Sequence, residues 1–207
     1  MSKGVRRQAS GVRREATGDG RQATGDGGFP KTFLLGFTMP HDLAKLYLQD
    51  IVQRFQVYKQ LGEGAIDQVE DAKLTWRPDP DSNSIAVLVK HLAGNMRSRW
   101  TEFLSTDGEK PNRNRDGEFE LAAVADRREL LAWWEDGWGR LFETLGQLQA
   151  EDLTRTVTIR QVPHTVVQAI NIQLGHYAYH VGQIVLLARH LAGGRWKTLS
   201  TPRRKPQ

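Results

Sequence analysis

Residues 175–184 read Gly-His-Tyr-Ala-Tyr-His-Val-Gly-Gln-Ile, within a long segment that has the apolar spacing of an amphipathic helix. His176 and His180 are four residues apart, so a helix places both imidazoles on one face. Such a pair can bind one metal ion, but it is also typical of partly buried histidines that bond to carbonyl or carboxylate groups. Because Ile172 and Leu187 continue this face, we expect the pair to point into a helical bundle.

A third histidine, His91, lies between Leu88 and Leu92 on the apolar side of an upstream helical segment. Taken alone, a packed core histidine is the simpler interpretation. Three neutral imidazoles, however, are a suitable ligand set for Zn²⁺ or Ni²⁺, and the chain has no cysteine that could supply a thiolate. The sequence therefore predicts one divalent ion on His91, His176 and His180. Three protein ligands would leave positions for water or substrate, as is typical of catalytic sites.

Four segments have the three- and four-residue apolar spacing of amphipathic helices. Their apolar faces run from Leu43 and Leu46 to Leu61, from Ile85 to Phe103, from Leu130 to Leu148, and from a capping box at Thr165 and Gln168 to Gly193. Residues 154–162 alternate apolar and polar side chains and predict a small extended element before the last helix. The polar residues 105–120 form a connection long enough to cross a bundle. The predicted fold is all-α, an antiparallel-type four-helix bundle.

The charge is unevenly divided along the chain. Residues 1–38 carry +4 and residues 195–207 carry +5, whereas residues 39–194 carry −4. We expect 1–38 to be a disordered low-complexity extension, 39–194 the folded domain, and 195–207 a disordered basic tail. Met39 is a candidate natural start. Basic tails without a basic folded face argue against nucleic-acid binding. No apolar run reaches the ~20 residues that span a bilayer, so we expect a cytoplasmic protein without a membrane segment.

The segment 107–119 contains the remaining candidates for chemistry. Its charged side chains can form a salt-bridge lattice that orders the loop, which is the commoner outcome for such surface segments. Alternatively the segment is a lid over the metal, in which Arg113 and Arg115 recruit an anionic substrate and Glu118 acts as a base or as an outer partner of a ligand. Asn95 and Gln183 are spaced so that they could reach the same cavity as hydrogen-bond partners of the ligands.

Several motifs occur together with the histidines. They are Trp76-Arg77-Pro78, His91-Leu92-Ala93-Gly94-Asn95, Asp107-Gly108-Glu109-Lys110, 113–119, and His176-x₃-His180-Val181-Gly182-Gln183-Ile184. On these residues the chain resembles the DinB-like (YfiT-like) superfamily, within a branch of unknown function, over roughly 39–194. The resemblance implies a four-helix bundle, a three-histidine metal site on His91, His176 and His180, and frequent homodimers. Some relatives transfer a low-molecular-weight thiol to electrophiles, and others have no assigned activity.

Two classes of function follow from these observations. The first is a divalent-metal-dependent enzyme in which a metal-activated water or thiol attacks a small-molecule substrate, by hydrolysis or thiol transfer. The second is a non-catalytic, dimeric, stress-related protein that binds the metal without turnover. A fourth protein ligand that closes the metal's coordination shell would favour the second class, and an open position facing a pocket would favour the first.

Overall fold

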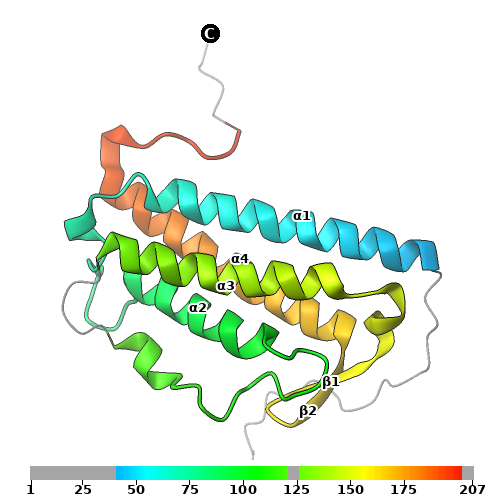
Figure 1. Ribbon diagram of the computed structural model, residues 1–207. Coiled ribbons are helices and arrows are strands. Elements are labelled where there is room, and N and C mark those ends of the chain that lie inside the picture. The colour runs from blue at the N-terminus through cyan, green and yellow to red at the C-terminus, as the bar shows by residue number, and fades with distance from the viewer. Residues whose placement is uncertain (1–40, 121–125, 202–207) are drawn as a thin grey trace, which may run out of the picture. The chain divides into compact units, whose positions relative to one another are not determined.

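The computed structural model of this chain describes residues 41–120 and 126–201. Four long helices form a bundle, with a two-stranded antiparallel sheet just before the last helix (Figure 1). The long elements are α1 (His41–Ile66), α2 (Ile85–Trp100), α3 (Arg127–Gln147), β1 (Thr156–Ile159), β2 (Val162–Thr165) and α4 (Val166–Ala192). Four short 3₁₀ helices complete the order: η1 (Asp71–Lys73), η2 (Asp116–Phe119), η3 (Ala150–Thr154) and η4 (Gly193–Arg195). The predicted all-α bundle with a small extended element is confirmed.

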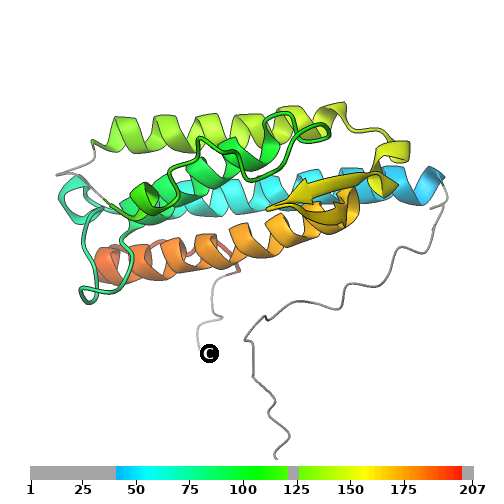
Figure 2. The ribbon, with the colours of Figure 1, turned by 90° about the horizontal axis from the view of Figure 1, so that it is seen from below.

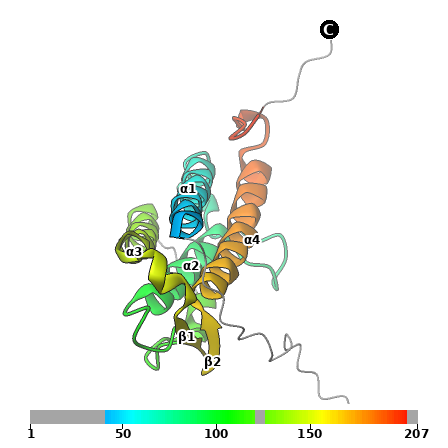
Figure 3. The same cartoon turned by 90° about the vertical axis from the view of Figure 1, so that its right-hand side faces the viewer.

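The helices are arranged so that α2 packs against α3 and α4, while α1 lies on the other side of the bundle and packs against α4 and α3 (Figure 3). Helices α2 and α3 run in the same direction, because residues 101–120 return along α2 before α3 begins (Figures 1 and 2). The antiparallel arrangement that the sequence suggested therefore holds for α1 with α2 and for α3 with α4, but not for α2 with α3. The long 105–120 connection is what allows this topology.

A cluster of four aromatic rings, one from each helix, forms the centre of the core. The ring of Phe55 lies 6.3 Å from that of Trp100, 6.2 Å from that of Trp138 and 5.8 Å from that of Tyr177. The indole Nε1 of Trp100 donates to the Tyr177 hydroxyl at 2.9 Å, which satisfies the polar ends of these two rings, whereas Nε1 of Trp138 has no hydrogen-bond partner among the described residues. Because Tyr177 is adjacent to His176 in α4, this cluster fixes the part of α4 that carries the candidate metal ligand His176.

Side-chain caps mark the starts of α2 and α4. The Ser84 side chain accepts from the backbone N–H of Val87 at the start of α2, and Thr165 forms the predicted capping box with Gln168 at the start of α4. Helix α4 ends at Gly193, whose φ of 55° lies in the left-handed region that favours glycine. Local sequence therefore determines where α2 and α4 begin and where α4 stops.

The turn between β1 and β2 is unusual because Arg160 and Gln161, with φ of 52° and 62°, occupy left-handed positions normally filled by Asn and Gly. The carboxylate of Asp107 accepts from the backbone N–H groups of both residues, at 2.9 and 2.7 Å. The N–H of Gly108 adds a bond to the carbonyl of Thr158 at 2.8 Å. These bonds compensate the strained turn and attach the 105–120 segment to the hairpin.

Two parts of the predicted apolar faces are wrong. Leu43 and Leu46 are more than half exposed, because they face away from the core, and the inward residue at this end of α1 is Ala44, which shares the buried face of Ile51 and Phe55. Ile172 is also largely exposed, so it does not continue the inward face of His176 and His180, although Leu187 is half-buried.

The packed chain continues beyond the predicted boundary at 194. The backbone N–H of Lys197 donates to Gln68 at 2.6 Å, and Leu199 lies against Gly64 of α1. Residues 195–201 therefore contact the bundle, whereas 202–207, the 1–38 extension and Met39 lie outside the described residues. Within the described part of the chain, no helix has the length and apolar character needed to cross a membrane. The cytoplasmic location stays a prediction.

Candidate metal centre

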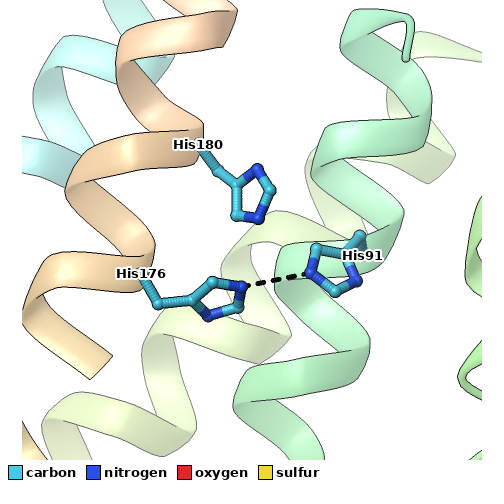
Figure 4. Close-up of side chains that lie close together, drawn as sticks. All are labelled: His91, His176 and His180. Atoms are coloured by element: carbon cyan, nitrogen blue, oxygen red, sulfur yellow. Dashed lines mark hydrogen bonds between the residues drawn. The ribbon is translucent and has the colours of Figure 1, made fainter. Parts of the chain in front are cut away.

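Three histidines from two neighbouring helices meet between α2 and α4 (Figure 4). His91 is in the first half of α2, and His176 and His180 are one turn apart in α4. One ring nitrogen of each lies within 4.8 Å of the other two, and the Nε2 atoms of His91 and His176 are 3.2 Å apart. His91 and His180 are buried and His176 is half-buried. The structure thus brings together the three side chains that the sequence suggested as ligands.

Glu118, in η2, fixes the orientation of His91. Its Oε2 is 2.9 Å from Nδ1 of His91, and Arg113 donates Nε–H and Nη2–H to its two oxygens at 2.7 Å each. Burial opposes ionisation, but the hydrogen bonds from His91 and Arg113 hold the pKa of Glu118 below its usual range. A charged Glu118 keeps a proton on Nδ1 of His91, which leaves the Nε2 lone pair facing the other two histidines.

Gln183 has the equivalent position beside His180. Its Oε1 atom is 2.8 Å from Nδ1 of His180, and because an amide oxygen can only accept, that Nδ1 carries the proton. The Nε2 of Gln183 donates to the hydroxyl of Tyr179 at 3.2 Å, which determines which way the amide points. The Nε2 atom of His180 is therefore the one available to an ion.

The surroundings keep two of the imidazoles neutral. Burial lowers the pKa of His176 to about 3, with smaller contributions from the charges of His180, His91, Arg113 and Arg99. Burial also lowers the pKa of His180. Neutral imidazole is the form that coordinates a metal, so neither side chain has to be deprotonated at pH 7 before it can bind an ion.

The donor set fits a borderline divalent ion such as zinc or nickel, since both accept imidazole nitrogen and the chain has no thiolate to offer. Zinc–nitrogen bonds of about 2.0–2.1 Å place two ligands of a tetrahedral ion about 3.4 Å apart. The 3.2 Å between the Nε2 atoms of His91 and His176 is close to that separation. Within residues 41–120 and 126–201, no fourth His, Asp or Glu joins the cluster. The described residues therefore offer three ligands.

The two arginines suggested as anion-binding residues lie in different places. Arg113, with a side chain only 4% exposed, is engaged by Glu118 and also lies 3.2 Å from Glu109, so it orients the partner of a candidate ligand. Arg115 is half exposed and lies over the ring of Phe119, at 5.5 Å from its centroid. The segment thus forms the salt-bridge lattice that the sequence analysis gave as the commoner outcome, and this lattice includes Glu118.

Asn95 does not make the contact with the histidines that its spacing suggested. Its Oδ1 accepts from the Tyr177 hydroxyl at 2.9 Å, which places it in the core hydrogen-bond chain that includes Trp100. Of the remaining histidines, the exposed His190 stacks on Trp76 with ring centroids 5.1 Å apart. These residues support the helices around the site rather than the ligands.

Gly94 and Phe119 also shape the site, and the sequence analysis gave neither of them this role. A Cβ on Gly94 would collide with Oε1 of Glu118, so the glycine leaves the space in which that carboxylate sits. The ring of Phe119 lies 4.8 Å from that of His91. The sequence offers one signal for Phe119, an aromatic residue in an otherwise polar segment, and none for the role of Gly94.

A cavity of about 720 Å³ opens between α2, α3 and the segment that contains η2. Lys90, Gly94, Arg97, Glu118 and Trp133 are among its lining residues, and none of the three histidines lines it. Its connection to the histidines is through Glu118, which lines the cavity and also bonds to His91.

Comparison with known proteins agrees with the four-helix fold. The family described as a protein of unknown function, DUF1572, matches residues 42–205. Among solved structures, the chain is similar to a DinB-like protein, YjoA, from Bacillus subtilis, at 15% sequence identity and a TM-score of 0.56. That match covers 74% of this chain and 99% of the other, and at such low identity it speaks for the fold alone. None of the curated proteins matches. The chain therefore belongs to the DUF1572 family of unknown function, and its fold is DinB-like.

Proposed function

We propose that this protein is a metal-dependent enzyme that holds one divalent ion, zinc or nickel, on His91, His176 and His180. The observation that carries the proposal is the convergence of three imidazoles, two of which have their Nδ1–H groups fixed by Glu118 and Gln183. Three protein ligands are typical of catalytic sites, whereas structural zinc sites normally have four. An ion bound there would lower the pKa of a coordinated water or thiol and so supply a nucleophile near neutral pH.

The protein's own residues would hold and orient the reacting groups. Glu118 and Gln183 keep the Nε2 lone pairs of their histidines directed at one point, and Arg113 keeps Glu118 charged. Both hydrolysis of a small molecule and transfer of a low-molecular-weight thiol to an electrophile are compatible with this arrangement.

A non-catalytic metal-binding protein, such as a stress-related one, is the second candidate, and the bonding of Glu118 favours it. Both oxygens of that carboxylate accept hydrogen bonds from Arg113, one of them also bonds to His91, and its pKa is lowered. A carboxylate with these partners is a poor general base. We therefore assign Glu118 to positioning of His91, and catalysis would depend on the ion.

The two candidates are separated by activity measured before and after metal removal. Hydrolysis would be followed with p-nitrophenyl acetate, and thiol transfer with glutathione and 1-chloro-2,4-dinitrobenzene. We expect activity in at least one assay, its loss with a chelator, its return with Zn²⁺ or Ni²⁺, and its absence in His176→Ala but not in the control His190→Ala. Activity that survives complete metal removal would contradict the proposal, and bound metal without turnover of either probe would favour the second candidate.

We also propose that the protein is a homodimer that pairs through the outer face of α4, a helix at the edge of the bundle (Figure 3). Ile172, Tyr179 and Leu186 are seven residues apart on this face and are 46%, 62% and 69% exposed. Gly175 and Gly182 lie between them with open space around each Cβ position, which allows close approach of another helix. No Asp, Glu, Lys or Arg occurs in residues 166–188, so self-association there buries no such charge.

Light scattering after gel filtration tests the dimer. We expect a dimeric mass for the natural sequence, a monomeric mass for Leu186→Glu, and a dimeric mass for the control Val162→Glu, which alters an exposed apolar residue of β2. A monomeric natural protein would refute the proposal.

A further inference from the structure

Arg99, near the C-terminal end of α2, carries a buried charge that the surrounding residues compensate poorly. Its side chain is 5% exposed, and its Nε and Nη1 atoms have no hydrogen-bond partner among the described residues. Its ion pair with Glu109 is long, at 3.7 Å between Nη2 and Oε2. Buried donors without partners cost free energy, and a buried guanidinium costs more than a neutral donor. The geometry indicates that another group belongs beside Arg99.

The carboxylate of Glu109 is shared by three guanidinium groups. Nη1 of Arg113 lies 3.2 Å from one oxygen, and Nε of Arg160 lies 3.2 Å from the other, in addition to the longer pair with Arg99. Burial lowers the pKa of Arg99, and the nearby charges of Arg113 and Arg160 lower it further, against the opposing effect of Glu109. Arg113 is also paired with Glu118, so Glu109 is left to compensate both Arg99 and Arg160, and the cluster has room in its charge balance for an anion.

This cluster lies at the end of the bundle where the hairpin meets α2 and α4 (Figure 1). Gly108 packs against the Arg99 side chain, and a Cβ there would be 2.8 Å from Nη1. Shared ion pairs connect Arg99 to the candidate metal ligands, because Glu109 contacts both Arg99 and Arg113, and Arg113 also pairs with Glu118, the partner of His91. Arg99 is therefore enclosed by the 107–113 segment and the hairpin and is linked to His91 through this segment.

We propose that Arg99 binds the anionic group, a carboxylate or a phosphate, of the small molecule on which the three-histidine centre acts. The unpartnered Nε–H and Nη1–H groups of Arg99 can each donate to an oxygen of either group, and such charge-assisted hydrogen bonds are strong. Arg99 and His91 are eight residues apart, about 12 Å along the helix axis, so the anionic and reacting groups occupy separate parts of the ligand. This assigns anion recognition to Arg99 in place of Arg113 and Arg115.

The inference rests on the proposed function only for the link between the anion and the metal, because anion binding itself can be measured separately. Calorimetric titration of the protein as purified, with inorganic phosphate as the probe, tests it in the natural sequence, in Arg99→Gln and in Arg97→Gln. Arg97 is the matched control, since it is two residues away on α2, 54% exposed and paired with Asp136. We expect phosphate to bind the natural protein and Arg97→Gln, and to bind Arg99→Gln at least about tenfold more weakly.

An Arg99→Gln variant that binds phosphate as tightly as the natural protein would overturn the proposal, as would a natural protein that does not bind phosphate. Should Arg99→Gln fail to fold by circular dichroism, nuclear magnetic resonance of the arginine Nε–H groups in the natural protein decides. The Nε–H resonance of Arg99 is identified as the one that is absent from the spectrum of Arg99→Lys. We expect this resonance to shift when phosphate is added to the natural protein, and an unchanged resonance refutes the inference.

Zinc content measured on the same samples keeps the two proposals apart. We expect Arg99→Gln to retain the zinc of the natural protein. If phosphate binding depends on Arg99 but the protein takes up no zinc, the result supports the anion site and refutes the metal centre.

Discussion

Replacing Glu118 with glutamine tests whether that carboxylate prepares His91 to bind metal. The amide can still accept from Nδ1 of His91, but it has no charge, and its NH₂ group faces the guanidinium of Arg113. Loss of such an outer hydrogen-bond partner weakens metal affinity by about 10- to 100-fold, or about 1.4–2.7 kcal/mol. Because Arg113 keeps its pairing with Glu109, we expect the fold to persist, with a loss of about 3 kcal/mol in unfolding free energy.

The assay is competition for zinc between the protein and a chelating dye, which gives a dissociation constant for each variant. The matched control is Asp116→Asn, which removes a 94% exposed carboxylate from the same 3₁₀ helix as Glu118 and should leave zinc affinity unchanged. Zinc dissociation constants that agree within twofold between Glu118→Gln and the natural protein would show that this carboxylate does not prepare His91, and the reasoning would fail.

Three further predictions concern the supports of the site. Gly94→Ala should weaken zinc binding, because the new Cβ displaces the Glu118 carboxylate. The control Gly139→Ala, in open space on α3, should leave zinc binding unchanged and only raise stability by about 1 kcal/mol. Equal zinc affinity for both variants would contradict this prediction. Burial raises the pKa of Asp107, but three backbone N–H donors hold that pKa below its usual range. The carboxylate therefore stabilises the fold fully above its unfolded pKa of about 4, and this stabilisation is lost as the pH falls through the lower pKa of the folded state. Urea unfolding should therefore show Asp107→Asn less stable than the natural protein at pH 7, with a smaller difference at pH 3; an undiminished difference would count against that carboxylate. Gln183→Leu should weaken zinc binding by about tenfold, since Nδ1 of His180 loses its acceptor, and unchanged binding would show that the amide does not orient the ligand.

The helices and the ligand pair could be predicted because they depend on local spacing. The i,i+4 relation of His176 and His180 and the capping box at Thr165 need only the geometry of one helix. Where a prediction required the position of a helix in the bundle, it failed in places. Leu43 was assigned to the apolar face of α1, but the adjacent Ala44 is the residue that the neighbouring helices bury, and the local sequence does not specify which of the two they cover.

Contacts made by the 105–120 segment could be predicted only in part. The segment was suggested as a lid because it is long and charged, and Glu118 was among its candidate residues. The bond between Glu118 and His91 joins residues 27 apart, so it depends on the return path of the chain along α2. For the same reason the sequence does not distinguish Arg99, whose donors are buried without partners, from Arg113, which is fully engaged by carboxylates.

The most direct test of the metal centre is elemental analysis of protein purified without a histidine tag and equilibrated with zinc. We predict one ion per chain in the natural protein and in His190→Ala, whose imidazole stacks on Trp76 away from the three ligands. We predict close to none in His91→Ala or His176→Ala, with helical content retained by circular dichroism. The same zinc content in all four proteins would contradict the three-histidine centre.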